Sequence, residues 1–160
     1  MIQIVPMDQT HVEAVAALEK QCFADPWSLQ SIAGELTNPL ALWLVAVTDA
    51  GTVAGYAGSQ FVLDEADVMN VAVSPAERRS GTGSQLMLAL MRELAGRGIR
   101  ILTLEVRTSN TAAVSMYDRL GFKQVGRRTR YYFHPVEDAL ILRAELLETQ
   151  GGAFFEYTGH

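Results

Sequence analysis

The N-terminal part of the chain combines one short apolar run with two stretches of helical periodicity. Residues 2–5 predict a strand, and the capping box Thr10-His11-Val12-Glu13 predicts a helix that runs to about residue 20. Ser28 can cap a second helix, because four apolar residues after it recur at helical spacing: Leu29, Ile32, Ala33 and Leu36. We therefore expect a strand followed by two helices.

Three strand-like apolar runs occupy the middle of the chain, over residues 41–47, 52–62 and 66–73. The first two runs are joined by Asp49-Ala50-Gly51, which suits a hairpin turn. An acidic loop precedes the third run. This region predicts three strands, of which the first two form a hairpin.

The order of elements changes in the second half of the chain. Periodicity predicts a helix, a strand, a helix and two further strands, over residues 81–95, 101–106, 111–120, 122–130 and 139–147. The first of these helices therefore connects two strands as a β-α-β crossover. Gly121 directly follows the predicted helix over residues 111–120, at the position where a residue in the left-handed conformation commonly ends a helix. The predicted fold class is α/β or α+β with a mixed sheet.

Length and composition limit the number of domains. Of the 160 residues, 49% are apolar, and these can fill one substantial hydrophobic core. A chain of this length is therefore not expected to form a second independent domain. We expect one folded domain over residues 1–147 and a loose C-terminal tail over residues 148–160.

Charge and cysteine content exclude several classes of function. A formal net charge of −5 argues against a nucleic-acid-binding surface, because phosphate binding needs a concentrated positive field. No window reaches the roughly 18 apolar residues of a membrane span. Cys22 is the single cysteine, and His11, His134 and His160 lack ligand spacing, so neither a disulfide nor a metal site is predicted. We expect a cytoplasmic protein.

A glycine-containing turn, Arg78-Arg79-Ser80-Gly81-Thr82-Gly83, lies between the strand ending at Val73 and the next helix. A helix N-terminus offers unpaired backbone N–H groups to an anion, and glycine allows a close approach. A Walker loop is excluded because no Gly-Lys-Ser/Thr follows. Glu105 has the spacing of a Rossmann acidic residue, but Leu86 occupies the third glycine position. A surface loop without a ligand stays open as an alternative.

The order Arg-x-x-Gly-x-Gly, helix, strand and Asn-x-x-Ala resembles the coenzyme A site of the GNAT acetyltransferases. The resemblance implies a single-domain GNAT fold, with a mixed, mostly antiparallel sheet of about seven strands and about four flanking helices. It also implies acetyl-CoA as co-substrate, with the turn on the pyrophosphate and the preceding strand on pantetheine. The residues implied are Val71, Ala72, Val73, Arg78, Arg79, Ser80, Gly81, Thr82, Gly83 and Ser84.

Two residues are candidates for proton transfer. Glu105 is a carboxylate near the end of an apolar strand, on the same face as Thr103 and Arg107. Burial would make it a general base, whereas an ion pair with Arg107 would be structural, and the pattern does not separate these interpretations. Tyr117, on the following helix, would by itself be a packing aromatic.

A more specific resemblance covers about residues 1–147. It is carried by Pro26-Trp27-Ser28, Val62-Leu63-Asp64-Glu65-Ala66, Asn70-Val71-Ala72-Val73, Leu104-Glu105-Val106-Arg107, Ser109-Asn110, Ala112-Ala113, Met116-Tyr117, Leu120-Gly121-Phe122, Arg127-Arg128, Tyr131-Tyr132 and Glu137-Asp138-Ala139. These segments resemble the bacterial ribosomal-protein alanine N-acetyltransferases. The resemblance implies Glu105 as proton acceptor, Tyr117 as proton donor and Asn110 as a coenzyme A contact. It implies a partner as well, the N-terminal alanine of ribosomal small-subunit protein eighteen, and a monomer or weak dimer.

Acceptor recognition is the least determined part of the prediction. Asp64, Glu65 and Asp67 form an acidic loop that could meet a basic peptide or remain a solvated turn. Trp27 and the pair Tyr131-Tyr132 could line an acceptor groove or pack in the core. A transferase for a small amine or a lysine side chain, and a non-catalytic acyl-CoA-binding module, are the alternative functions.

Overall fold

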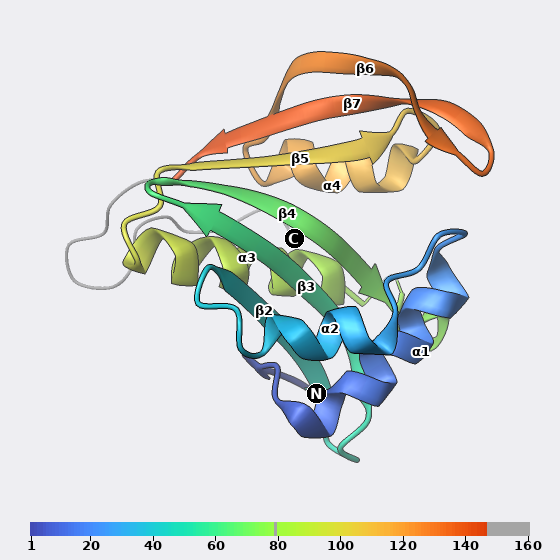
Figure 1. The fold of residues 1–160 in the computed structure, drawn as a ribbon, viewed down its shortest axis with the longest axis vertical. Helices are drawn as coiled ribbons and strands as arrows, with labels where there is room; N and C mark the ends of the chain where they lie inside the picture. The colour runs from blue at the N-terminus through green and yellow to red at the C-terminus, as the bar shows by residue number, and fades with distance from the viewer. Residues whose placement is uncertain (79, 147–160) are drawn as a thin grey trace. The chain divides into compact units, whose positions relative to one another are not determined.

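The computed structural model describes residues 1–78 and 80–146 (Figure 1). It has four α-helices and a seven-stranded mixed sheet, as the resemblance to the GNAT acetyltransferases implies. The strand order is β1-β2-β3-β4-β5-β7-β6. The chain divides into two compact units, residues 1–60 with 69–90 and residues 61–68 with the chain from 91 onward. The predicted tail, residues 148–160, lies outside the described residues.

The first unit is built on three antiparallel strands. Its elements are β1 (Ile2–Pro6), α1 (Val12–Cys22), α2 (Leu29–Glu35), β2 (Ala41–Thr48), most of β3 (Val53–Val62), the second half of β4 (Glu65–Val73) and the start of α3 (Thr82–Gly96). Strand β2 pairs with β1 on one side and with β3 on the other. The turn between β2 and β3 contains Gly51, whose φ of 84° favours glycine, so the predicted hairpin is confirmed.

The core of the first unit is aromatic at its centre. Helix α1 buries one stripe against β2 and β3, and Ile32 of α2 joins the same cluster. Trp43 stacks on Tyr56 with ring centroids 5.9 Å apart. Gly58 makes this arrangement possible, because a Cβ atom at that position would lie 2.4 Å from the Trp43 ring.

Two local predictions for the first unit are wrong. The capping box belongs to Asp8 and His11 around a short 3-10 turn (Gln9–His11), because the carboxylate of Asp8 accepts from the Thr10 N–H and His11 reaches back to Asp8. Ser28 caps α2 as expected. However, Leu29 of the predicted apolar stripe is 48% exposed, because α2 is only seven residues long and buries just Ile32 completely.

The second unit contains the parallel pairing of the two strands that the predicted crossover joins. The start of β4 pairs in parallel with β5 (Ile101–Arg107), with Glu65 opposite Ile101 and Asp67 opposite Thr103. Strand β7 (Val136–Glu145) pairs antiparallel with both β5 and β6 (Lys123–Phe133). Helix α4 (Thr111–Arg119) runs alongside β5 (Figure 1). Gly121 ends α4 with a φ of 96°, as predicted.

Element boundaries differ from prediction where polar residues continue a strand. Strand β6 extends to Phe133, so Tyr131 and Tyr132 lie within a strand. The predicted acidic loop is wrong for Glu65 and Asp67, which belong to β4, and right for Asp64, which is in the turn before it. Both strands extend further than predicted because backbone pairing with a neighbouring strand continues through polar residues. A strand face that is exposed to solvent can consist of polar side chains, so apolar periodicity does not mark its ends.

Candidate active site

The glycine-containing turn lies in the first unit, between β4 and α3. A short 3-10 turn (Pro75–Glu77) follows β4, and Gly81 has a φ of 81°, a conformation that favours glycine. The backbone N–H of Gln85 donates to the carbonyl of Gly81 at 3.0 Å, so Gly83 and Ser84 are in the first turn of α3. Hydroxyl groups of Ser80 and Thr82 are 3.0 Å apart. The turn therefore presents a helix N-terminus, which suits an anion.

Arg78 faces the backbone at this turn. Its Nε donates to the carbonyl of Val73 at 3.1 Å, and its Nη2 is 3.5 Å from the Cys22 thiol. The guanidinium thus connects the end of β4 to the end of α1. Val71, Ala72 and Val73 precede this contact on β4, with Ala72 buried. Arg79 lies outside the described residues.

Glu105 lies in the second unit, on the half-exposed face of β5. Leu102, Leu104 and Val106 are buried, so Thr103, Glu105 and Arg107 project from the opposite face. The alternative of a Glu105–Arg107 ion pair is wrong, because Arg128 of β6 supplies the partner, with its Nε 3.4 Å from Oε1 of Glu105.

Arg107 instead secures the connection between β6 and β7. Its guanidinium donates to the carbonyl oxygens of Pro135 at 2.9 Å and His134 at 3.2 Å, and to Glu137 at 3.2 Å. It also lies 4.3 Å from the ring centroid of Tyr132, within the range of a cation–π contact. One cation therefore contacts both the hairpin turn between β6 and β7 and a tyrosine of β6.

Glu137 is the anionic partner in this arrangement. It accepts hydrogen bonds from the Ser109 N–H at 2.6 Å and the Thr108 hydroxyl at 3.0 Å. Hydrogen bonds from Ser109, Thr108 and Arg107 lower the pKa of Glu137 to about 2. The carboxylate is thus held ionised between the end of β5 and the β6–β7 hairpin.

Three tyrosines are near this cluster. Tyr117 is buried on α4, with its ring centroid 5.4 Å from that of Phe122, and burial together with nearby Tyr132 raises the pKa of its phenol. Burial, Tyr131 and Glu105 raise the pKa of Tyr132 to about 12. Tyr131 is 44% exposed, and its pKa is raised by burial and by Glu105. All three phenols are therefore protonated at neutral pH and can act as proton donors.

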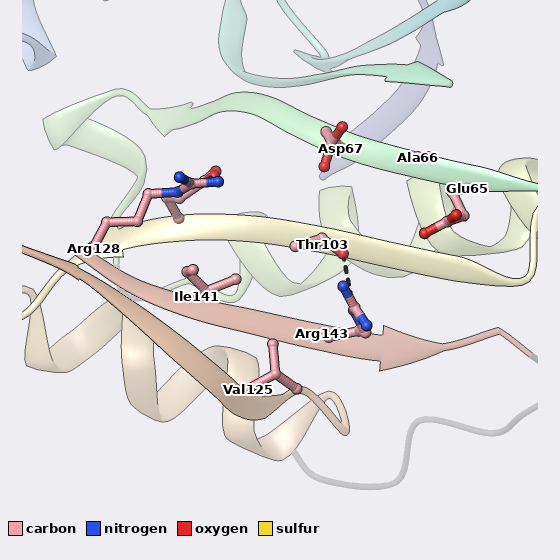
Figure 2. A pocket seen from close by; sticks show the side chains of 9 residues that line it. Glu65, Ala66, Asp67, Thr103, Val125, Arg128, Ile141 and Arg143 are labelled. Carbon is pink, nitrogen blue, oxygen red and sulfur yellow. Dashed lines mark hydrogen bonds and ion pairs between the residues drawn. The ribbon is translucent and has the colours of Figure 1, made fainter. Parts of the chain in front are cut away.

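A pocket of about 390 Å³ opens beside Glu105 (Figure 2). Strands β4, β5, β6 and β7 line it with Glu65, Ala66, Asp67, Thr103, Glu105, Val125, Arg128, Ile141 and Arg143. Figure 2 shows Glu65 and Asp67 on β4 on one side, and the dashed line from Arg143 to the Thr103 hydroxyl, at 3.3 Å, on the other. Its lining contains three carboxylates and two guanidinium groups, and Arg128 is already paired with Glu105.

The remaining predicted residues have partly structural positions. Trp27 is half-buried in the loop between α1 and α2, and it packs edge-on against Trp43 at 5.3 Å. Asn110 is the N-cap of α4, where its side-chain oxygen accepts from the Ala113 N–H at 3.2 Å. The backbone carbonyl of Asp64 accepts from the N–H groups of Arg100 and Ile101.

Two residues with clear roles in the structure were missed from the sequence: Arg128 and Glu19. Neighbouring residues of a strand face opposite sides of the sheet, so one of Arg127 and Arg128 had to share a face with Glu105. The adjacent arginines could therefore have predicted an ion-pair partner for Glu105. Glu19 follows Val12 and Val15 on the apolar stripe of α1, a helical spacing that signals a buried carboxylate.

No three His, Cys, Asp or Glu side chains in residues 1–78 and 80–146 form a cluster able to hold a metal ion. Within the same ranges, no helix is both long and apolar enough to cross a membrane.

Comparison with known proteins gives consistent matches. A family model described as the acetyltransferase (GNAT) family matches residues 12–122. The ribosomal protein bS18-alanine N-acetyltransferase of Escherichia coli K12 is 38% identical over 147 residues, covering 89% of this chain and 96% of that protein. The Haemophilus ducreyi protein of the same name is 39% identical over 129 residues, covering 78% and 87%. The crystal structure of the E. coli enzyme superimposes with a TM-score of 0.84 at 34% identity, covering 97% of this chain and all of that one.

Proposed function

Because the chain belongs to the GNAT family of acetyltransferases, we propose that it transfers the acetyl group of acetyl-CoA to the N-terminal amine of a protein, namely the N-terminal alanine of ribosomal protein bS18. The observation that carries this proposal is the similarity to the E. coli enzyme of that name, which extends over nearly the whole of both chains. We infer that the reaction takes place in the cytoplasm, where ribosomal proteins are made.

The proposed chemistry is a direct transfer. The amine attacks the thioester carbonyl, a C–N bond forms and the C–S bond breaks. Glu105 accepts the proton that the amine loses, and Tyr117 donates a proton to the departing thiolate. An N-terminal amine has a pKa of about 7.7–8.0, so roughly a tenth of it is neutral at pH 7, and the base has less work than it would have with lysine. The half-exposed position of Glu105 and the protonated phenol of Tyr117 support these roles.

Acetyl-CoA would be held by two kinds of contact. Backbone groups of Val71, Ala72 and Val73 would pair with the pantetheine amides, and the turn from Arg78 through Arg79, Ser80, Gly81, Thr82 and Gly83 to Ser84 would hold the pyrophosphate. The positive φ of Gly81 and the helix that begins at Thr82 fit an anion at this turn. The Asn110 cap of α4 uses only the side-chain oxygen, so the amide nitrogen can donate to the coenzyme.

The acceptor would be recognised by aromatic and acidic side chains. Trp27 is half-buried and Tyr131 is half-exposed, so both can offer apolar area together with a polar tip. Tyr132 is fixed by Arg107. Asp64 and Glu65 are exposed at the start of β4, and they would attract an acceptor that carries positive charge.

Mass spectrometry after incubation with acetyl-CoA tests the proposal. The substrates are a peptide with the N-terminal sequence of bS18, the same peptide with a blocked N-terminus and an added internal lysine, and a panel of small amines. We expect a single acetyl group on the N-terminal alanine of the first peptide and none on the blocked one. Modification only of lysine or of small amines would contradict the acceptor assignment, and absence of turnover on every amine would indicate a non-catalytic acyl-CoA-binding module.

A further inference from the structure

Glu19 of α1 is the one charged side chain that is completely buried among the residues described. It lies on the stripe of the helix that also buries Val12, Val15 and Ala16 against the first unit's core. A carboxylate is costly to bury unless its oxygens are hydrogen-bonded. Its partners therefore indicate what it does.

Both oxygens of Glu19 are used by groups from three other segments. Oε1 accepts from the backbone N–H of Trp27 at 2.8 Å, and Oε2 accepts from the hydroxyl of Tyr56 on β3. The side-chain amide of Asn70 on β4 donates to Oε2 at 2.9 Å and to Oε1 at 3.1 Å. These donors are all neutral, so the carboxylate acts as a junction of hydrogen bonds.

The positions of two of these donors connect the junction to the proposed reaction. Trp27 is in the loop between α1 and α2 and is a proposed acceptor contact. Asn70 directly precedes Val71, Ala72 and Val73, the segment proposed to pair with pantetheine. Tyr56 adjoins neither segment in sequence, and it stacks on Trp43 in the core. One carboxylate thus holds one loop and one strand segment that serve different substrates.

We propose that Glu19 is a positioning residue, which fixes the Trp27 loop and the Asn70 segment of β4 together through its two oxygens. This proposal rests on the proposed function for the identity of the two substrates. An apolar residue of similar volume could fill the same space without ordering the loop, because it has no acceptor for the Trp27 N–H. The carboxylate therefore fixes the position of the Trp27 loop relative to the Asn70 segment of β4, which apolar packing alone would not determine.

Kinetics of Glu19→Gln provide the first test, with Tyr56→Phe as the matched control. Glutamine keeps the volume but turns one acceptor oxygen into a donor, which opposes the Trp27 or Asn70 N–H. We expect KM for the bS18 peptide to rise about tenfold and KM for acetyl-CoA about threefold, with a smaller change in kcat. Tyr56→Phe removes one hydrogen bond to Glu19 and should lower Tm while leaving both KM values within about twofold. Assays are run well below the Tm of the least stable variant.

Hydrogen exchange gives a second measurement that does not depend on activity. Selective isotope labelling of tryptophan makes the backbone N–H of Trp27 visible by NMR. Its exchange should accelerate about tenfold or more in Glu19→Met, which has a similar volume and no oxygen acceptor for this N–H, and remain within about twofold of wild type in Tyr56→Phe. If wild type acetylates no N-terminus, the proposed function fails, while this exchange result still decides whether Glu19 orders the loop.

The positioning role is overturned if Glu19→Gln lowers Tm but leaves both KM values unchanged, or if Glu19→Met leaves the Trp27 exchange unchanged. It is equally overturned if Tyr56→Phe changes them as much, because the effect would then be loss of stability. Should Glu19→Gln fail to fold, Asn70→Ala tests the β4 contact alone. That variant should raise KM for acetyl-CoA about threefold and leave the Trp27 exchange unchanged, and an unchanged KM would contradict the proposal.

Discussion

Replacing Glu105 with glutamine separates a proton acceptor from a structural carboxylate. Glutamine has nearly the same shape and keeps an oxygen acceptor, but it cannot take a proton at neutral pH. The side chain of Glu105 is 23% exposed and that of its ion-pair partner Arg128 is 55% exposed. An ion pair this accessible to water contributes at most about 1 kcal/mol to the free energy of unfolding. The substitution should therefore leave the fold intact.

The expected catalytic loss is much larger than the loss of stability. A general base contributes about 10²–10⁴-fold to the rate, which corresponds to roughly 2.7–5.5 kcal/mol of activation free energy. We expect kcat on the bS18 peptide to decrease by a factor of about 10²–10⁴, and KM for acetyl-CoA to change by less than about threefold. The deficit should shrink between pH 7 and pH 9, because the amine of the acceptor, with a pKa of about 7.7–8.0, becomes neutral without assistance.

Release of the coenzyme A thiol, measured with a chromogenic disulfide, follows the reaction, and thermal unfolding follows the fold. Glu93→Gln is the matched control, because Glu93 is an exposed glutamate on α3 and the same chemical change is made there. A Glu105→Gln enzyme that keeps more than about a third of wild-type kcat would refute the role of base. A large loss that stays constant from pH 7 to pH 9 would point to misplacement of the acceptor instead.

Three further predictions concern other residues. Tyr117→Phe should lower kcat on the bS18 peptide about 10²-fold or more with Tm nearly unchanged, as measured by thiol release and circular dichroism, and a kcat near that of wild type would exclude the phenol as donor. Gly58→Ala should cost about 1–3 kcal/mol in urea unfolding, because the new methyl group would lie 2.4 Å from the Trp43 ring. Because the pKa of Glu137 is lowered from 4.5 to about 2, its stabilising effect is complete above pH 4.5 and is lost as the pH falls toward 2. The difference in unfolding free energy between wild type and Glu137→Gln should therefore be constant above about pH 5 and shrink below it, and a difference that grows in acid would contradict the assigned pKa.

The order of elements could be predicted from the sequence because apolar periodicity is strong in the buried strands and helices. Strand β5 alternates completely between buried and half-exposed residues, and Gly121 marks the end of α4. Prediction was weakest where strands are solvated, as in β6, where only Gly126 and Tyr132 are even half-buried and the strand nevertheless extends to Phe133. Pairing with β7 defines that strand, and a single sequence contains no record of the partner.

The candidate site was predictable in its residue types more than in its contacts. The face of β5 that carries Glu105 follows from alternation, but the choice between Arg107 and Arg128 as ion-pair partner depends on the register between β6 and β7. That register is shifted at two places along β6, between Gln124 and Gly126 and between Arg128 and Tyr132. Such irregularities depend on local backbone geometry, which residue spacing does not encode.

The contact between Arg128 and Glu105 has a consequence for how ionic strength acts on the enzyme. In the proposed reaction, an acceptor ammonium that reaches this carboxylate would meet the Arg128 guanidinium, whose Nε lies 3.4 Å from Oε1 of Glu105. Binding at this point would exchange one cation for another, so the local charge would be nearly the same before and after. Added salt would weaken the contact that is broken and the contact that forms alike, so attraction of the acceptor over longer distances would depend on the other two carboxylates of the pocket, Glu65 and Asp67.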